Sequence, residues 1–185
     1  MSQKNRQTDE ELMWRLSRGE LKAAGYLFER YQLPLYNFFR RQFGDQTLSE
    51  DLTQNVFERM IRYKKSYIRG MSFKSWVFQI ARNVRADQFK SQKVKVSNFA
   101  DAGLLAQPDD STQQKLESKE QLNQLQSALQ KLSRDQREVL ELTRFQKLKY
   151  SEVAHLLGCT EGAVKVKVHR AIHQLRKHFF KMEKL

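Results

Sequence analysis

Residues 149–175 read KYSEVAHLLGCTEGAVKVKVHRAIHQL, and this stretch decides the fold of the C-terminal part of the chain. Ser151 can cap a first short helix. The inward positions of that helix are Val153, Ala154, Leu156 and Leu157. Gly158 supplies the left-handed residue that ends it, and Thr160 caps the next helix. We therefore expect two short helices joined at a glycine.

The second of these helices has an apolar face and a basic face. Its apolar residues recur at helical spacing, at Val164, Val168, Ala171, Ile172 and Leu175. The opposite side carries Val166, His169, Arg170, His173 and Lys177, with Lys165 and Lys167 on its flanks. This pattern predicts a helix-turn-helix whose second helix enters a DNA major groove. The alternative is a basic, solvated helix in a helical bundle.

The overall composition also favours a polyanionic partner. The formal net charge is +13, which is typical of proteins that meet nucleic acid or an anionic membrane surface. No apolar run approaches the ~20 residues that a membrane span needs, so membrane insertion is not expected. The polar N-terminus lacks the apolar core of a signal peptide. Cys159 is the only cysteine, which excludes a disulfide framework, and we expect a reducing, cytoplasmic location.

Local signals in the N-terminal half predict a series of helices. Thr8 and Glu11 make a capping box that opens a helix ending near Gly19. A helical stretch rich in aromatic residues follows at residues 21–43. Pro34 lies inside this stretch and should kink or restart the helix.

Two further helices are predicted in this half. Thr47 and Glu50 form a second capping box, which starts a helix at about residues 49–64. After a glycine-containing break, Ser72 opens a last helix that runs to about Lys90. Because glycine and proline are scarce and β-branched alternation is almost absent, we predict an all-α protein.

Periodicity is then lost, and the mildly acidic residues 93–115 are typical of a flexible linker. Beyond it we expect a helix ending near Leu132, a helix opened by Ser133, and the helix-turn-helix. The sequence therefore predicts two small helical domains, at residues 8–92 and 116–185.

The helix at residues 49–64 carries large apolar residues on two faces. Its inward stripe is expected at Leu52, Val56, Met60 and Tyr63. Phe57 and Ile61 point to the other side, beside Asp51, Gln54 and Glu58. Apolar residues on a polar face favour docking to something outside the domain. The alternative is that another helix of the domain, such as the one from Leu21, covers them.

The next helix mixes aromatic and basic side chains. Its aromatic residues are Phe73, Trp76 and Phe78, its basic residues are Arg82, Arg85 and Lys90, and Asn83 adds an amide. Aromatic rings interleaved with arginines suit single-stranded nucleic acid, because unpaired bases stack on rings and phosphates need neutralising. The alternative for Trp76 and Phe78 is ordinary packing in the core.

Several of these motifs resemble the extracytoplasmic-function (ECF) sigma factors, small sigma-70-family subunits of bacterial RNA polymerase. SEDLTQNVF at residues 49–57 and FKSWVFQIARN at residues 73–83 resemble the second region of this family. LSRDQREVL at residues 132–140, with the helix-turn-helix, resembles the fourth region. The resemblance covers nearly the whole chain in the right order, and the large central region of housekeeping sigma factors is missing.

The resemblance implies a function and partners. It implies an alternative, signal-responsive sigma factor that binds core RNA polymerase and directs promoter recognition, DNA melting and transcription initiation. Its promoter DNA would be duplex at the −35 element and melted at the −10 element. An anti-sigma factor is a further implied partner, and no cofactor is implied.

The resemblance also implies site residues, position by position. Those matching the polymerase-docking positions are Asp51, Gln54, Asn55 and Phe57, with Ile61 beside them. Asn83 matches a position that reads a flipped −10 base, and the loop at residues 67–72 matches a loop that helps to enclose such a base. The other residues expected at the −10 element are Tyr67, Phe73, Arg82 and Arg85. Those expected at the −35 element are Lys165, Val166, Lys167, His169 and Arg170. Val166 and Ala163 stand where serine and threonine are frequent, so the −35 preference stays open.

The sequence gives less support to two other classes of function. No glycine-rich phosphate loop, nucleophile motif or paired-carboxylate constellation favours an enzyme. Cys159 with His155, or His169 with His173, have metal-like spacing but no third ligand, so no metal is expected. The remaining rival is a free-standing helix-turn-helix regulator whose N-terminal domain binds an effector or dimerises. Such a regulator would bind a duplex operator alone, whereas a sigma factor needs core polymerase and melts DNA.

Overall fold

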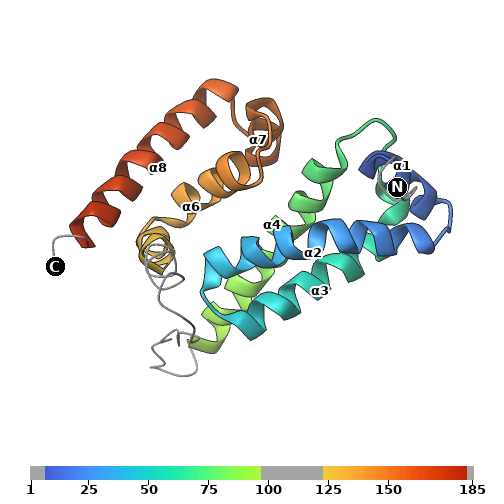
Figure 1. Ribbon diagram of the computed structural model, residues 1–185, viewed down its shortest axis with the longest axis horizontal. Coiled ribbons are helices and arrows are strands. Elements are labelled where there is room, and N and C mark those ends of the chain that lie inside the picture. The colour runs from blue at the N-terminus through green and yellow to red at the C-terminus, as the bar shows by residue number, and fades with distance from the viewer. Residues whose placement is uncertain (1–6, 97–122, 183–185) are drawn as a thin grey trace, which may run out of the picture. The chain divides into compact units, whose positions relative to one another are not determined.

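The computed structural model of the protein describes residues 7–96 and 123–182. All regular structure in these two ranges is helical, which confirms the predicted class (Figure 1). The elements are α1 (Asp9–Ser17), α2 (Lys22–Phe43), α3 (Gln46–Arg62), the 3₁₀ turn η2 (Lys64–Ser66), α4 (Phe73–Val96), a helix at 123–130, α6 (Arg134–Leu140), the π-helical turn η3 (Glu141–Phe145), α7 (Tyr150–Leu157) and α8 (Glu161–Met182). They form two compact units, the first built from α1, most of α2, α3, η2 and α4. No helix of the described ranges is long and apolar enough to cross a bilayer.

The start of the first unit follows its local sequence signals. The predicted capping box is confirmed, because the Glu11 amide donates to Thr8 Oγ1 at 3.1 Å and the Thr8 amide donates to Glu11 Oε2 at 3.0 Å. The helix ends at Ser17, and Gly19 adopts a φ of 100° just beyond it. Its buried residues are Leu12, Met13 and Leu16.

The long second helix departs from expectation. α2 runs through Pro34 as one 22-residue helix, so the predicted restart at the proline is wrong. A proline inside a helix removes one backbone hydrogen bond. The loss is offset here because α2 is anchored on both sides of the proline by the buried side chains of Leu27, Leu35 and Phe38. The helix ends at Phe43, the predicted end of the stretch, and Gly44 follows it with a φ of 76°.

The third helix also begins differently. α3 starts at Gln46, so Thr47 lies within its first turn and the predicted capping box of Thr47 and Glu50 is wrong. Instead, Gln46 Nε2 donates to Glu50 Oε1 at 3.2 Å. The inward stripe is confirmed at Leu52, Val56 and Met60. Tyr63 is 50% exposed, because α3 ends at Arg62 and the chain then bends into η2.

The fourth helix begins where it was predicted but is longer. The Ser75 amide donates to Ser72 Oγ at 3.3 Å, which confirms Ser72 as the cap. Phe78 is buried and packs against Phe38 with ring centroids 5.7 Å apart, so the core alternative is confirmed for this residue. α4 continues to Val96, past the expected end near Lys90, because no glycine or proline interrupts it. The rest of the predicted linker at residues 93–115 lies outside the described residues.

The second unit contains the predicted helix-turn-helix. Ser133 caps α6 as expected, since its Oγ accepts from the Gln136 amide at 3.3 Å. α7 begins at Tyr150, so Ser151 lies inside the helix and is not its cap; the Lys149 amide instead donates to Glu152 Oε2 at 2.8 Å. The left-handed Gly158, with a φ of 62°, ends α7 as predicted.

The last helix is fixed by its cap and its buried face. Thr160 Oγ1 accepts from the Ala163 amide at 3.2 Å, which confirms the predicted cap of α8. Val164, Val168 and Ala171 are buried, whereas Ile172 and Leu175 are only half-buried. Leu157 of α7 is likewise half-buried rather than in the core. The buried positions of α8 therefore determine which side of the helix faces outward.

Candidate nucleic-acid interface

The outward face of α8 carries the residues expected to contact duplex DNA. Its exposed side chains are Lys165, Val166, Lys167, His169, Arg170, His173 and Lys177. Val166, an apolar residue, is 49% exposed at the centre of this face. The buried residues of α8 lie on the opposite side of the helix. These exposed side chains therefore point away from the rest of the unit. The lysines and Arg170 can neutralise phosphates, and Val166 can contact a thymine methyl.

A second polar face lies on α4. Asn83 is exposed, and its Oδ1 accepts from Gln79 Nε2 at 3.1 Å. The same Gln79 carboxamide accepts from Arg82 Nη1 at 3.2 Å. Gln79 therefore links the predicted base-reading amide to a neighbouring cation. Sequence reasoning missed Gln79, although its place one turn before Asn83 was a usable signal.

The aromatic residues before and at the start of α4 are not at the surface. Tyr67 is 5% exposed and Phe73 is fully buried, so our expectation that these rings stack on an unpaired base is corrected. The Tyr67 ring packs against Trp76 with centroids 5.4 Å apart, and Phe73 packs edge-on against Tyr31 at 5.0 Å. The rings fill the interior beneath the loop at residues 67–72 because burying their large apolar area stabilises the fold more than exposure would.

The hydroxyl of Tyr67 closes that loop. It donates to the carbonyl oxygen of Met71, and burial raises the pKa of Tyr67 to about 12, so the phenol stays protonated at neutral pH. At the loop's surface, Ile68 is 66% exposed and the Arg69 guanidinium lies 5.2 Å from the centre of the Trp14 ring. The loop is therefore stabilised by its own hydrogen bond from Tyr67 to Met71 and by the contact of Arg69 with Trp14 of α1.

The residues of the expected protein-docking face on α3 differ in their exposure. Asp51, Gln54 and Ile61 are exposed, Ile61 at 40%, and Asn55 is half-buried. The outward placement of Phe57 is wrong, since it is 7% exposed and packs against Phe28 of α2 with ring centroids 4.7 Å apart. Phe28, which remains 43% exposed, takes its place at the surface. The alternative that α2 covers this side is thus confirmed for Phe57.

Within residues 7–96 and 123–182, no three His, Cys, Asp or Glu side chains are grouped so that they can share a metal ion. The pairs Cys159 with His155 and His169 with His173 therefore have no third ligand from the described parts of the chain.

Comparisons with known proteins place the same two regions in one family. The family model for Sigma-70 region 2 matches residues 27–94, and that for Sigma-70, region 4 matches residues 122–175. The RNA polymerase sigma factor CarQ of Myxococcus xanthus is 30% identical over 92% of this chain and 97% of its own. The ECF RNA polymerase sigma factor BldN of Streptomyces coelicolor is 32% identical over 89% of this chain, which spans 63% of BldN.

The fold is shared with a solved sigma factor. RpoE of Bartonella quintana, in complex with the anti-sigma factor NepR, aligns with a TM-score of 0.67 at 24% identity. The alignment covers 82% of this chain and 92% of that one. At this level of identity the likeness shows a common fold.

Proposed function

Because the chain belongs to the extracytoplasmic-function group of the sigma-70 family of RNA polymerase sigma factors, we propose that it binds core RNA polymerase and promoter DNA through three separate faces. α8 contacts the duplex −35 element, α4 holds the melted −10 element, and α3 docks on the polymerase. The observation that carries this proposal is the exposed basic face of α8 in a helix-turn-helix whose turn and caps are in place.

The proposed −10 surface uses polar side chains rather than rings. Asn83 can donate and accept at once, so its amide can read the edge of an unpaired base. Arg82, half-buried on the same helix, would neutralise a phosphate of the opened strand, whereas the Nε and Nη1 atoms of Arg85 are buried in the free protein. Tyr67 and Phe73 are buried before and at the start of this helix, so they are not part of the proposed surface.

The proposed polymerase-docking surface combines polar and apolar side chains of α3 and α2. Asp51, Gln54 and Asn55 supply its polar contacts, and Ile61 with Phe28 supplies its exposed apolar area. Phe57 backs this surface from below. An apolar patch rimmed by polar residues is typical of a protein interface.

Regulation by an anti-sigma factor is part of this proposal. RpoE of Bartonella quintana, which shares the fold, is solved in complex with the anti-sigma factor NepR. We propose that this chain is held in the same general way until a signal releases it. It then acts in the cytoplasm with core polymerase, as an initiation factor without catalysis or cofactor of its own.

In vitro transcription separates this function from that of a free-standing regulator. Purified chain added to core polymerase should yield run-off transcript and permanganate-reactive thymines at a promoter. The chain alone should open no DNA. A footprint on duplex DNA that is equally strong without polymerase, with no transcript when polymerase is present, would favour the regulator.

The −35 contact can be tested on α8. Changing Arg170 to Ala should weaken promoter binding by about 1–3 kcal/mol, because the contact of the guanidinium with a phosphate or a guanine edge is lost. Changing Val166 to Ser should alter preference at one base pair and leave overall affinity nearly the same. Binding of the holoenzyme to a set of single-base promoter variants measures both effects.

The matched control is Arg176→Ala, which removes the same exposed side chain further along α8. It should weaken binding less than Arg170→Ala does and equally on every promoter variant. Wild-type footprints for both Arg170→Ala and Val166→Ser would show that the recognition face is misplaced.

A further inference from the structure

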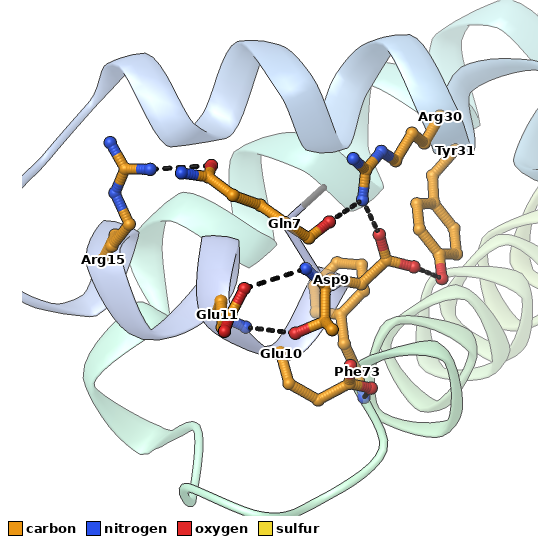
Figure 2. A network of polar contacts seen from close by, with 9 residues as sticks. Gln7, Asp9, Glu10, Glu11, Arg15, Arg30, Tyr31 and Phe73 are labelled. Carbon is orange, nitrogen blue, oxygen red and sulfur yellow. Dashed lines mark hydrogen bonds and ion pairs between the residues drawn. The ribbon is translucent and has the colours of Figure 1, made fainter. Parts of the chain in front are cut away.

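The first turn of α1 holds two other helices through consecutive carboxylates. Glu10 Oε1 accepts from the backbone amide of Phe73 at 3.1 Å, across 63 residues of sequence. Asp9 accepts from the Tyr31 hydroxyl at 2.6 Å and from Arg30 Nη1 at 2.5 Å. Figure 2 shows Glu10 beside the Phe73 amide while the Asp9 carboxylate is turned toward Arg30 and Tyr31. α1 is therefore bonded to α2 by one residue and to α4 by the next.

Glu10 acts as a cap supplied from a distant element. Phe73 is the first residue of α4, and the first amides of a helix have no acceptor within the helix. The Ser72 hydroxyl accepts a hydrogen bond from the amide of Ser75, and the Glu10 carboxylate accepts one from the amide of Phe73. A negative charge at this end also interacts favourably with the helix dipole.

The same turn fixes the loop that precedes α4. The loop at residues 67–72 is closed by the bond from Tyr67 to Met71 and ends at the amide that Glu10 holds. Trp14 of α1 lies under Arg69 of the loop, and Tyr31, bonded to Asp9, packs edge-on against Phe73. Burial and the hydrogen bond to Asp9 raise the pKa of Tyr31 above its ordinary value, so it remains a donor. The middle of the loop, at Arg69, and its C-terminal end, at the Phe73 amide, are thus connected to α1.

The charge of this turn is unexpected for a protein that binds DNA. Asp9, Glu10 and Glu11 are consecutive carboxylates in a chain of net charge +13, close to a loop that we place at the melted strand. Free carboxylates there would repel phosphate. Each of these three instead accepts a hydrogen bond from the protein, which points to a structural use of their charge.

We propose that α1 is a positioning element for the −10 surface, and that Glu10 holds the loop at residues 67–72 and the start of α4 in the arrangement that captures an unpaired base. Glu10 is a positioning residue: it contacts the Phe73 amide and not the DNA. This inference rests on the proposed role of Asn83 in strand opening. Without the hydrogen bond from Phe73, the loop would open more often and base capture would be slower.

Substitutions at Glu10 distinguish the effect of its side-chain length from the effect of its negative charge. Glu10→Gln keeps an acceptor oxygen in place, whereas Glu10→Asp keeps the charge but shortens the side chain by one methylene. Glu10→Ala removes both. The matched control is Glu11→Ala, which breaks the capping box of α1 without touching α4. Circular dichroism of each variant checks that the domain is folded.

Hydrogen exchange on the free protein gives the first readout. Glu10→Ala and Glu10→Asp should speed exchange of the amides at residues 68–75 by about 10-fold or more, since a hydrogen bond to a charged group is lost. Glu10→Gln should have a clearly smaller effect than either, because it keeps the acceptor oxygen and loses only the charge. Glu11→Ala should speed exchange within α1 only.

Strand opening by the holoenzyme gives the second readout. Glu10→Ala and Glu10→Asp should reduce permanganate-reactive thymines by about 5-fold or more on a duplex promoter, because the loss of one hydrogen bond lowers the population of the competent loop. A template premelted at the −10 element should restore activity, and binding to core polymerase should be unchanged. Asn83→Ala is run in parallel as the reference for loss of base reading.

The outcomes are distinct. Normal strand opening by Glu10→Ala beside a defective Asn83→Ala would overturn the positioning role while the proposed function stands. Equal defects in Glu11→Ala and Glu10→Ala would also overturn it, because they would trace to the stability of α1 as a whole. If Asn83→Ala opens DNA normally, the proposed −10 surface fails and the positioning role falls with it.

Discussion

Changing Asn83 to Ala is expected to reduce run-off transcription about 10-fold or more while core binding and closed-complex formation stay almost unchanged, because extruding a base costs a few kcal/mol that the amide helps to recover. Asn83 is exposed on α4, where Gln79 orients it, and its removal takes no packing from the core. Permanganate reactivity of thymines in the −10 element measures the defect directly. A template already mismatched at that element should largely restore activity.

Asn55→Ala is the matched control, since it deletes the same amide from the proposed polymerase-docking surface on α3. It should weaken polymerase binding and gain nothing from a premelted template. If Asn83→Ala instead loses affinity for duplex DNA, and premelting gives no rescue, then Asn83 contacts the duplex or supports the fold.

Changing Ile61 to Asp is expected to weaken binding to core polymerase by at least ~30-fold, because central apolar contacts of an interface often carry 2 kcal/mol or more. Ile61 is 40% exposed, so the new charge stays solvated in the free protein and the fold is kept. Titration of labelled chain with core polymerase gives the affinity, and circular dichroism reports the fold. Leu33→Asp, at a more exposed aliphatic residue of α2, is the control and should bind normally.

Phe57 cannot serve for this test, although the sequence suggested it. Its ring is 7% exposed against Phe28, so an aspartate would be buried without a partner. We expect Phe57→Asp to lower the free energy of unfolding by about 3 kcal/mol or more, which confuses lost folding with lost docking. An Ile61→Asp variant with wild-type affinity would remove α3 from the polymerase interface.

Features that depend on a few neighbouring residues were predictable from the sequence. Thr8, Ser133, Gly158 and Thr160 were correctly placed at helix ends, because a cap involves a side chain and an amide within about one turn. The outward face of α8 followed from the spacing of its buried stripe. Similar signals also misled, since Thr47 and Ser151 are capping residue types that lie inside helices.

Features that depend on contacts between distant segments were not predictable. Periodicity predicted that Phe57 and Ile61 share a mostly polar face of α3, and only the contact with Phe28 of α2 decides that Phe57 is covered while Ile61 stays exposed. The aromatic residues beside arginines suggested base stacking. In the structure, however, Tyr67 packs against Trp76 and Phe73 packs against Tyr31. Nothing in the sequence around Glu10 shows that its partner lies 63 residues away.

The attachment of α1 has a consequence for dissecting the protein into fragments. The match to Sigma-70 region 2 begins at residue 27, after α1 has ended. A fragment cut there would lose Leu12, Met13 and Leu16, each at most 1% exposed, from the core. It would also leave the Tyr31 hydroxyl and the Phe73 amide without their acceptors. The shortest fragment that folds by itself therefore starts well before the pattern by which the family is recognised.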